Sequence, residues 1–171
     1  MGSRIQQTNG FTLIELLLYV ALMSIMMLAM TAFLSMLLQA RIKNQAILEV
    51  DQQGLAAAQF ITQAIRNADS ITTPTIGASG STLTLAVAAP NNPTTFSVAS
   101  GVLQVSEAGG AGVALTNGRV VVSGLTVSNL SRSGTPGGVQ VQFTITHVNP
   151  SGRNEYDVSR TFTAGGALRF P

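Results

Sequence analysis

A single carboxylate, Glu15, stands at the start of a long apolar segment. After it, no charged residue occurs from Leu16 to Ala40. As a helix this stretch would span about 37 Å at roughly 1.5 Å per residue, enough to cross a bilayer core of about 30 Å. An ionisable group in hydrocarbon costs roughly 2.5–3.5 kcal/mol or more. Glu15 therefore needs a cationic partner, and the apolar segment supplies none.

The residues around Glu15 form a motif. Gly10-Phe11-Thr12-Leu13-Ile14-Glu15, after a short leader containing Arg4, resembles the class III prepilin leader of the type IV pilin superfamily. The resemblance is close over the leader and the apolar segment and loose over the rest of the chain. It implies cleavage between Gly10 and Phe11 by a prepilin peptidase on the cytoplasmic face, followed by N-methylation of Phe11. It also implies that Glu15 meets the new terminal amine of a neighbouring subunit in a helical filament.

The proposed charge pair is physically reasonable. A freed α-amino group has a pKa of about 7.7–8.0, so it is largely cationic at neutral pH. A pair between Glu15 of one subunit and the amine at Phe11 of another would relieve the cost of both charges in lipid.

A secretory signal or a plain single-pass anchor would account for less of this segment. A secretory signal has a shorter apolar region, and its cleavage site follows that region, whereas the site at Gly10 comes first. A plain anchor would have no use for Glu15. The flanking cations, Arg4 on one side and Arg41 and Lys43 on the other, do not decide orientation. The expectation that the N-terminus is cytoplasmic follows from the resemblance.

The composition argues against several classes of function. Hydrophobic residues make up 46% of the 171 residues, only 9% are charged, and the net charge is +2. So little charge does not indicate a nucleic-acid partner. The chain has no cysteine, which excludes disulfides and cysteine-based metal or thiol chemistry. Many major type IV pilins carry a disulfide that closes a C-terminal loop, so its absence favours minor pilins and secretion pseudopilins.

Helical spacing continues beyond the apolar segment to about residue 68. Between residues 11 and 68 there is no proline and only one glycine, Gly54, which could mark a gentle bend. Apolar residues recur there at steps of three and four, which predicts an amphipathic helix lying on a globular head. This stripe comprises Val50, Gly54, Ala58, Ile61, Ile65 and Ala68, flanked by Leu48 and Leu55.

The chain after residue 69 has the alternating pattern of β-strands. We expect strands at 81–88, 94–99, 102–105, 119–128, 139–148 and 155–163. Ser100-Gly101 predicts a tight hairpin, and Gly124 predicts an irregularity within its strand.

The predicted fold class is therefore α+β, with a long N-terminal helix packed on a small, mainly antiparallel β-sheet head in a pilin-like lollipop. The expected parts are a prepilin leader (1–10), a transmembrane or filament-core helix (11–40), an amphipathic continuation of that helix (41–68) and a β-rich head (69–171). The head resembles J-type minor pseudopilins of type II secretion and W-type minor pilins.

The remaining polar residues predict little chemistry. His147, the only histidine, is expected to be packed or on the surface. Glu155 and Asp157 are expected to share one face of the strand at 155–163. Two carboxylates alone are weak evidence for a calcium-binding site, so a solvated strand face is favoured. Neither a metal site nor a cofactor is expected, and no catalytic residue is identified. Three arginines that could contact DNA fit scattered surface charges better, namely Arg153, Arg160 and Arg169. Met23, Met26, Met27 and Met30 predict adaptable packing between neighbouring helices.

The resemblance implies a non-enzymatic structural subunit of the bacterial cytoplasmic (inner) membrane, with its head in the periplasm or outside. Its expected partners are the prepilin peptidase and other pilin or pseudopilin subunits. The first interpretation is a type II secretion minor pseudopilin that helps to initiate or cap the pseudopilus. The alternative is a minor type IV pilin for pilus assembly, adhesion, twitching motility or DNA uptake. A membrane-tethered binding or enzymatic domain is a third class, which a deep polar pocket in the head would favour.

Overall fold

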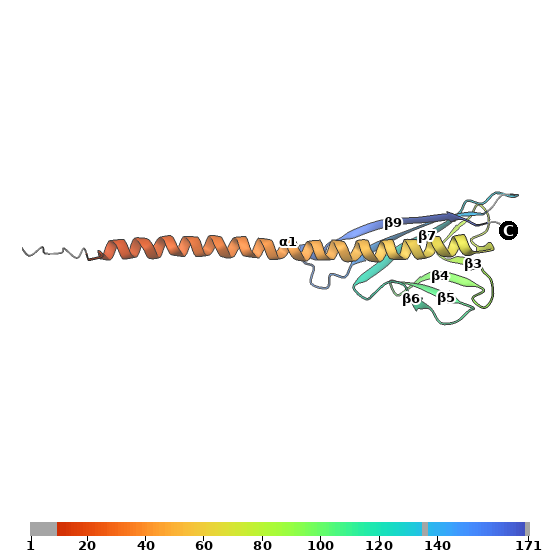
Figure 1. Cartoon of the computed structure of the whole chain (residues 1–171), viewed down its shortest axis with the longest axis horizontal. Coiled ribbons are helices and arrows are strands. Elements are labelled where there is room, and N and C mark those ends of the chain that lie inside the picture. Colours follow the sequence, from red (N-terminus) through yellow and green to blue (C-terminus); the bar gives the residue numbers. More distant parts are fainter. Residues whose placement is uncertain (1–9, 135–136, 170–171) are drawn as a thin grey trace, which may run out of the picture. The chain divides into compact units, whose positions relative to one another are not determined.

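The computed structural model describes residues 10–134 and 137–169. The predicted leader, apart from Gly10, lies outside the described residues. The chain divides into two compact units at residues 41 and 42. One helix, α1 (Leu13–Asn67), contributes to both units (Figure 1). The predicted α+β class, with a long apolar N-terminal helix that packs on antiparallel sheets, is confirmed.

The first unit contains the apolar part of α1. Its large apolar side chains are exposed, from Leu13 at 78% to Leu37 at 47%. Among the described residues, α1 is the one helix long and apolar enough to span a membrane. An isolated helix that is apolar on all sides is stable only in lipid or among other apolar surfaces.

The second unit contains two antiparallel sheets. Sheet A has the strand order β1-β3-β4-β5-β6, and sheet B has the order β2-β7-β8-β9. The strands of sheet A are β1 (Ser70–Thr73), β3 (Leu83–Ala86), β4 (Thr94–Ala99), β5 (Val102–Glu107) and β6 (Val113–Ala114). Those of sheet B are β2 (Ser79–Gly80), β7 (Val120–Asn129), β8 (Gly138–His147) and β9 (Ser159–Ala167).

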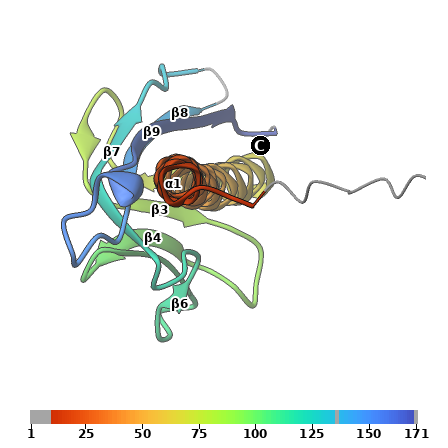
Figure 2. The same ribbon diagram turned by 90° about the vertical axis from the view of Figure 1, so that its left-hand side faces the viewer.

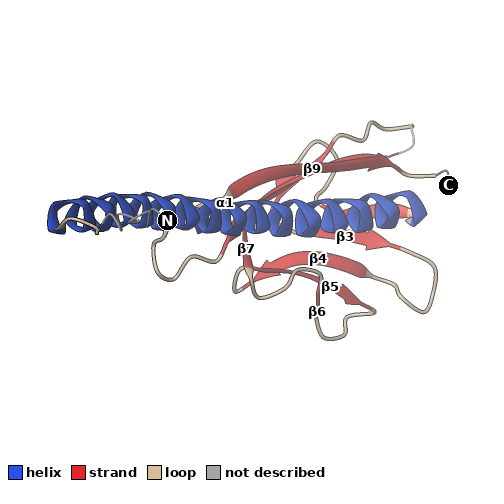
Figure 3. Ribbon diagram, turned by 60° about the vertical axis from the view of Figure 1, so that its left-hand side comes forward, coloured by secondary structure: helices blue, strands red, loops and turns tan. Residues whose placement is uncertain are grey.

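The C-terminal half of α1 lies between the two sheets (Figures 2 and 3). Strands β8 and β9 lie on one side of it, and β3 and β4 lie on the other. Its buried residues are spaced by three and four and face a core of alternating strand residues. They are Ala46, Val50, Gly54, Ala57, Ile61 and Ile65. The predicted stripe is confirmed at Val50, Gly54, Ile61, Ile65 and Ala68. It is wrong at Ala58, which is partly exposed while Ala57 is buried, and at the flanking Leu48 and Leu55, which are exposed.

The predicted hairpin turn and the predicted strand irregularity are both confirmed. Ser100 and Gly101 have φ values of 51° and 76° and join β4 to β5. Two consecutive positive φ values are those of the type I′ hairpin turn. In β7 the register with β8 shifts between Ser123 and Thr126, around Gly124 at φ 61°.

The predicted strand 155–163 is wrong at its start. Asn154–Tyr156 form a short 3-10 helix, η1, and β9 begins only at Ser159. The alternation of Tyr156 and Val158 imitates a strand, but the hydrogen bond from Val158 N–H to Tyr156 C=O closes a turn instead. The sequence also did not predict β1, β2 and β6. Strands β2 and β6 have 2 residues each, too few to show a period, and they pair with the longer strands β7 and β5, while β1 pairs with β3.

Candidate functional site

The first turn of α1 has a defined N-terminal cap. Thr12 precedes the helix, and its Oγ1 accepts a hydrogen bond from the Glu15 N–H at 3.3 Å. The Thr12 carbonyl also accepts from Glu15 N–H at 3.1 Å and from Leu16 N–H at 3.2 Å. Threonine followed three positions later by glutamate is the spacing of a capping box. Glu15 thus occupies a position where a carboxylate is favoured by the unpaired N–H groups and the dipole of the helix.

Within the chain, the carboxylate of Glu15 meets a hydroxyl rather than a cation. The Tyr19 hydroxyl donates to Glu15 Oε1 at 3.4 Å, and no ion pair joins Glu15 to any residue that the structure describes. The Tyr19 ring also meets the Phe11 ring edge-on, with centroids 6.2 Å apart. The structure therefore brings Phe11, Glu15 and Tyr19 together. The sequence prediction missed Tyr19, although its position four residues after Glu15 places it on the same helix face.

Gly10 precedes the helix and is exposed. A Cβ added to it would meet no atom within 4 Å, and its φ is not positive. The fold of the chain itself therefore does not require glycine at this position. A requirement for glycine here would have to come from another molecule that grips the backbone.

Three hydroxyls in the apolar part of α1 bond to the backbone of the same helix. The hydroxyls of Ser24, Thr31 and Ser35 donate to carbonyls of the preceding turn at 2.7, 2.8 and 2.7 Å. Such bonds remove the cost of a free hydroxyl in hydrocarbon. Beside them, Met23, Met26, Met27 and Met30 line a shallow apolar groove together with Tyr19 and neighbouring residues. This surface can pack against lipid or another apolar helix.

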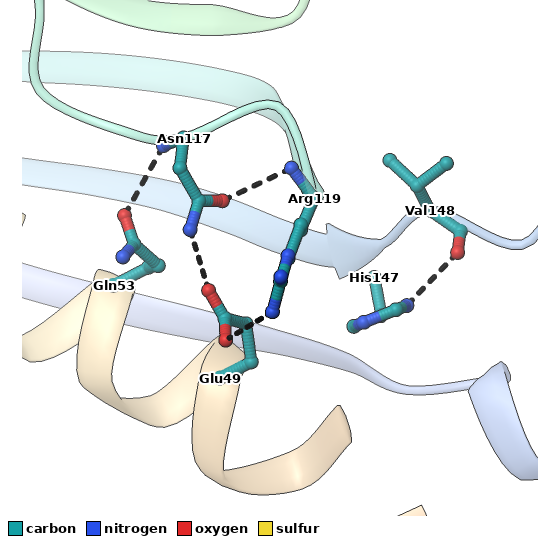
Figure 4. Close-up of polar contacts among 6 residues, drawn as sticks. All are labelled: Glu49, Gln53, Asn117, Arg119, His147 and Val148. Carbon is teal, nitrogen blue, oxygen red and sulfur yellow. Dashed lines mark hydrogen bonds and ion pairs between the residues drawn. The ribbon is translucent and has the colours of Figure 1, made fainter. Parts of the chain in front are cut away.

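In the second unit, a polar network ties α1 to the loop before β7 (Figure 4). The Asn117 side chain donates to the Glu49 carboxylate, and the Asn117 backbone N–H donates to Gln53 Oε1 at 3.2 Å. Arg119 N–H donates to Asn117 Oδ1 at 3.0 Å, and its guanidinium lies 3.8 Å from Glu49 Oε2. These contacts join Glu49 and Gln53 of the helix to Asn117 and Arg119 of the loop, so the network holds the loop on the helix.

His147 lies at the end of β8 and is packed rather than free. Its Nδ1 is 2.9 Å from the Val148 carbonyl oxygen (Figure 4). Its ring stacks on Tyr156 with centroids 5.3 Å apart. The guanidinium of Arg153 lies over the same tyrosine, 5.9 Å from the ring centroid. This stack anchors η1 against β8, in keeping with the expectation that His147 is packed.

The carboxylates proposed as a weak calcium pair do not share a strand face, because Glu155 lies in η1. Glu155 Oε1 lies 3.1 Å from the guanidinium of Arg153. A hydrogen bond from its own backbone N–H, and then the bond from Arg153, lower the pKa of Glu155. The described residues contain no group of three or more His, Cys, Asp and Glu side chains that could hold a metal.

Two of the three arginines considered for DNA contact form ion pairs within the chain. Arg153 pairs with Glu155, and Arg160 of β9 pairs with Asp51 of α1 at 3.1 Å. The groove between α1 and the β8–η1 segment measures about 640 Å³ and includes Glu49, Arg119 and His147 in its lining. These side chains are bonded to each other or to the backbone. The groove therefore shows no arrangement of nucleophile, base and substrate-binding groups.

Comparison with known proteins agrees with the N-terminal motif. Residues 6–31 match the family model of the prokaryotic N-terminal methylation motif. No curated protein and no solved structure matches the chain. The matched segment contains Gly10, Phe11 and Glu15 and supports a type IV pilin-like class III leader on a pilin- or pseudopilin-type subunit. Together with the apolar helix, it fits a membrane-anchored pilin that assembles with other pilin subunits after processing by a prepilin peptidase.

Proposed function

We propose that this protein is a structural minor pilin-like subunit, a type II secretion minor pseudopilin that helps to initiate or cap the pseudopilus. The observation that carries the proposal is that Glu15 has no cationic partner among the described residues. It is the one charged residue between residues 13 and 40 of α1, where the large apolar side chains are exposed. It lies within the matched methylation motif. An assembling subunit can supply the missing charge from its neighbour.

The processing step follows from the same residues. Cleavage between Gly10 and Phe11 creates an amine at Phe11, which N-methylation leaves able to carry a positive charge. In the inner membrane this amine would lie on the cytoplasmic side, with the second unit in the periplasm or outside. During assembly, the amine of one subunit pairs with Glu15 of the next, and the exposed apolar faces of their helices pack together.

A minor type IV pilin is the second candidate, for pilus assembly, adhesion, twitching motility or DNA uptake. The leader and a β-rich, cysteine-free head resemble both classes of subunit. The two candidates differ in what fails when the gene is deleted. Loss of protein secretion with normal pili supports the pseudopilin, whereas loss of pili, twitching or DNA uptake with normal secretion supports the minor pilin.

The processing proposal is tested by the intact mass of the full-length protein extracted from membranes. We expect a chain that begins at methylated Phe11. Gly10→Leu should leave the uncleaved precursor in the membrane without disturbing the fold, since residue 10 is exposed, precedes α1, and has no atom within 4 Å of an added Cβ. Leu13→Ile, a conservative change just beyond the scissile bond, is the matched control and should be processed. A mature N-terminus at any other residue would contradict the assignment.

A further inference from the structure

Strand β9 forms one edge of sheet B, and its outer side is open. Two hydrogen bonds establish which residues of β9 point their backbone N–H and C=O groups toward β8. The His147 N–H donates to the Val158 carbonyl, and the Leu168 N–H donates to the Gly137 carbonyl. In an antiparallel pair such bonded residues alternate with residues whose N–H and C=O point away. The outward-pointing residues are therefore Ser159, Thr161, Thr163, Gly165 and Ala167. All are exposed, and their backbone groups have no hydrogen-bond partner in the described part of the chain.

This edge lacks the features that usually prevent strands from pairing with other chains. Exposed edges are commonly short, bulged or charged, or contain proline. Strand β9 has 9 residues, no proline and an unbroken register with β8. Its one charge, Arg160, is bound to Asp51 of α1. The other sheet ends are protected, since β2 and β6 have 2 residues each and β1 has a register shift.

An exposed face of α1 adjoins this edge. Gly54 lies under Phe162, and Phe60 contacts Phe96 of sheet A. At about 100° per residue, Leu55 is turned from Gly54 in the direction opposite to Phe60, and Leu48 lies on the same side as Leu55. This side lies beyond β9 and away from sheet A. Leu48 is 66% exposed and Leu55 is 56% exposed.

The same side of α1 has a groove of about 600 Å³ with a positive end. Arg66 and Arg169 both line it, and none of its lining residues is acidic. Arg66 lies next to Gly166, so the positive end is at the C-terminal end of β9. Neither arginine forms an ion pair with a residue that the structure describes.

From this geometry we infer that the β9 edge and the adjoining face of α1 form a docking site for an extended, charge-poor segment of a partner protein. The segment adds a strand to sheet B through the outward backbone groups of β9. Its alternate apolar side chains lie on Leu48 and Leu55, and a carboxylate at one end meets Arg66 and Arg169. Strand addition of this kind takes its affinity from main-chain hydrogen bonds and its specificity from alternate side chains.

The test uses the full chain in detergent micelles and a short fluorescent peptide of alternating threonine and valine, with aspartate at both ends and blocked termini. Binding is followed by fluorescence anisotropy, with empty micelles as the blank. Two N-methylated isomers of the peptide are compared. One has a methyl group on the backbone nitrogen of every threonine, and the other has one on the backbone nitrogen of every valine. Because only alternate residues of an added strand donate to β9, only one isomer should lose binding, by about tenfold or more if several hydrogen bonds of about 1 kcal/mol disappear. If the peptide lies antiparallel to β9, the isomer methylated on threonine loses binding. If the peptide lies parallel to β9, the isomer methylated on valine loses binding.

Variants separate this site from general apolar adsorption. Leu55→Lys should weaken binding, whereas Val113→Lys should not, because Val113 is an exposed apolar residue of β6 that lies outside the proposed site. Arg169→Gln should remove the preference for a peptide ending in aspartate over one ending in asparagine. The proposal is overturned by the absence of saturable binding, by equal binding of both methylated isomers, or by equal loss in the two lysine variants. Dimerisation of the protein that excludes the peptide would also overturn it, because the occupant would then be a second copy.

Discussion

The ring of Phe162 in β9 packs directly against the backbone of Gly54 in α1, where a Cβ on residue 54 would overlap the ring. The ring is also stacked on Phe143 of β8, with centroids 5.9 Å apart and planes at 25°. Gly54 therefore allows the helix and sheet B to approach closely. The gentle bend proposed for Gly54 is not needed to explain a glycine here.

Gly54→Ala should destabilise the second unit even though alanine is the better helix former by about 1 kcal/mol. Overpacking typically costs about 1–3 kcal/mol, and the stacked ring has little room to move. In a Phe162→Ala background the same substitution should be neutral or stabilising. Urea unfolding of the four proteins of this cycle measures the coupling. Gln59→Ala, at an exposed position of the same helix, is the control for helix propensity. Additive effects would show that the ring does not select glycine.

Glu15→Leu should be processed normally, because the scissile bond is unchanged, yet enter filaments poorly. Leucine removes a charge that costs roughly 2.5–3.5 kcal/mol in lipid, but it also removes the attraction to a neighbouring amine. Glu15→Gln should reduce incorporation in the same direction. Tyr19→Phe removes only the hydroxyl bonded to Glu15 and tests whether positioning of the carboxylate matters. Filament or secretion output is measured against the amount of processed subunit in the membrane. Normal assembly of both Glu15 variants would rule out charge pairing.

A fragment starting at Ile42 should be soluble and should melt cooperatively. The residues of the core all lie between Ala46 and Ala164, so the fragment retains them. A fragment starting at Asp69 loses Ile61 and Ile65, both fully buried, and exposes the sheet faces that they cover. It should aggregate or bind a hydrophobic dye. Equal solubility and cooperativity of the two fragments would contradict the packing of α1 between the sheets.

The Arg153–Glu155 pair should make a small contribution to stability that depends on pH. The folded-state pKa of Glu155 is lowered, so the contribution is present above the unfolded-state pKa and is lost as pH falls through the folded-state pKa. A carboxyl NMR titration of Glu155 should give a midpoint below that of an ordinary glutamate. Arg153→Gln should raise the midpoint only in part, because the backbone N–H is the larger cause. Full return to the ordinary value would show that Arg153 alone is responsible.

The sequence by itself determined the features that arise within a short stretch of chain. The uncharged run after Glu15 dictates an apolar helix, because its composition leaves no polar face. Ser100-Gly101 dictates a hairpin, because few residues accept two consecutive positive φ values. Strand β8 follows its alternation in the same way, since one face is buried and the other is solvated.

Tertiary structure decided which distant residues meet. Nothing near Gly54 in the sequence indicates Phe162, and nothing in the alternation of β9 reveals that it lies at an open edge. The choice of Ala57 over Ala58 for the core, and the start of β9 at Ser159, likewise depend on the packing of α1 between two sheets. A local period sets which face of an element is apolar. The neighbour of that face is set by the free energy of the whole packed core, to which α1 and strands of both sheets contribute.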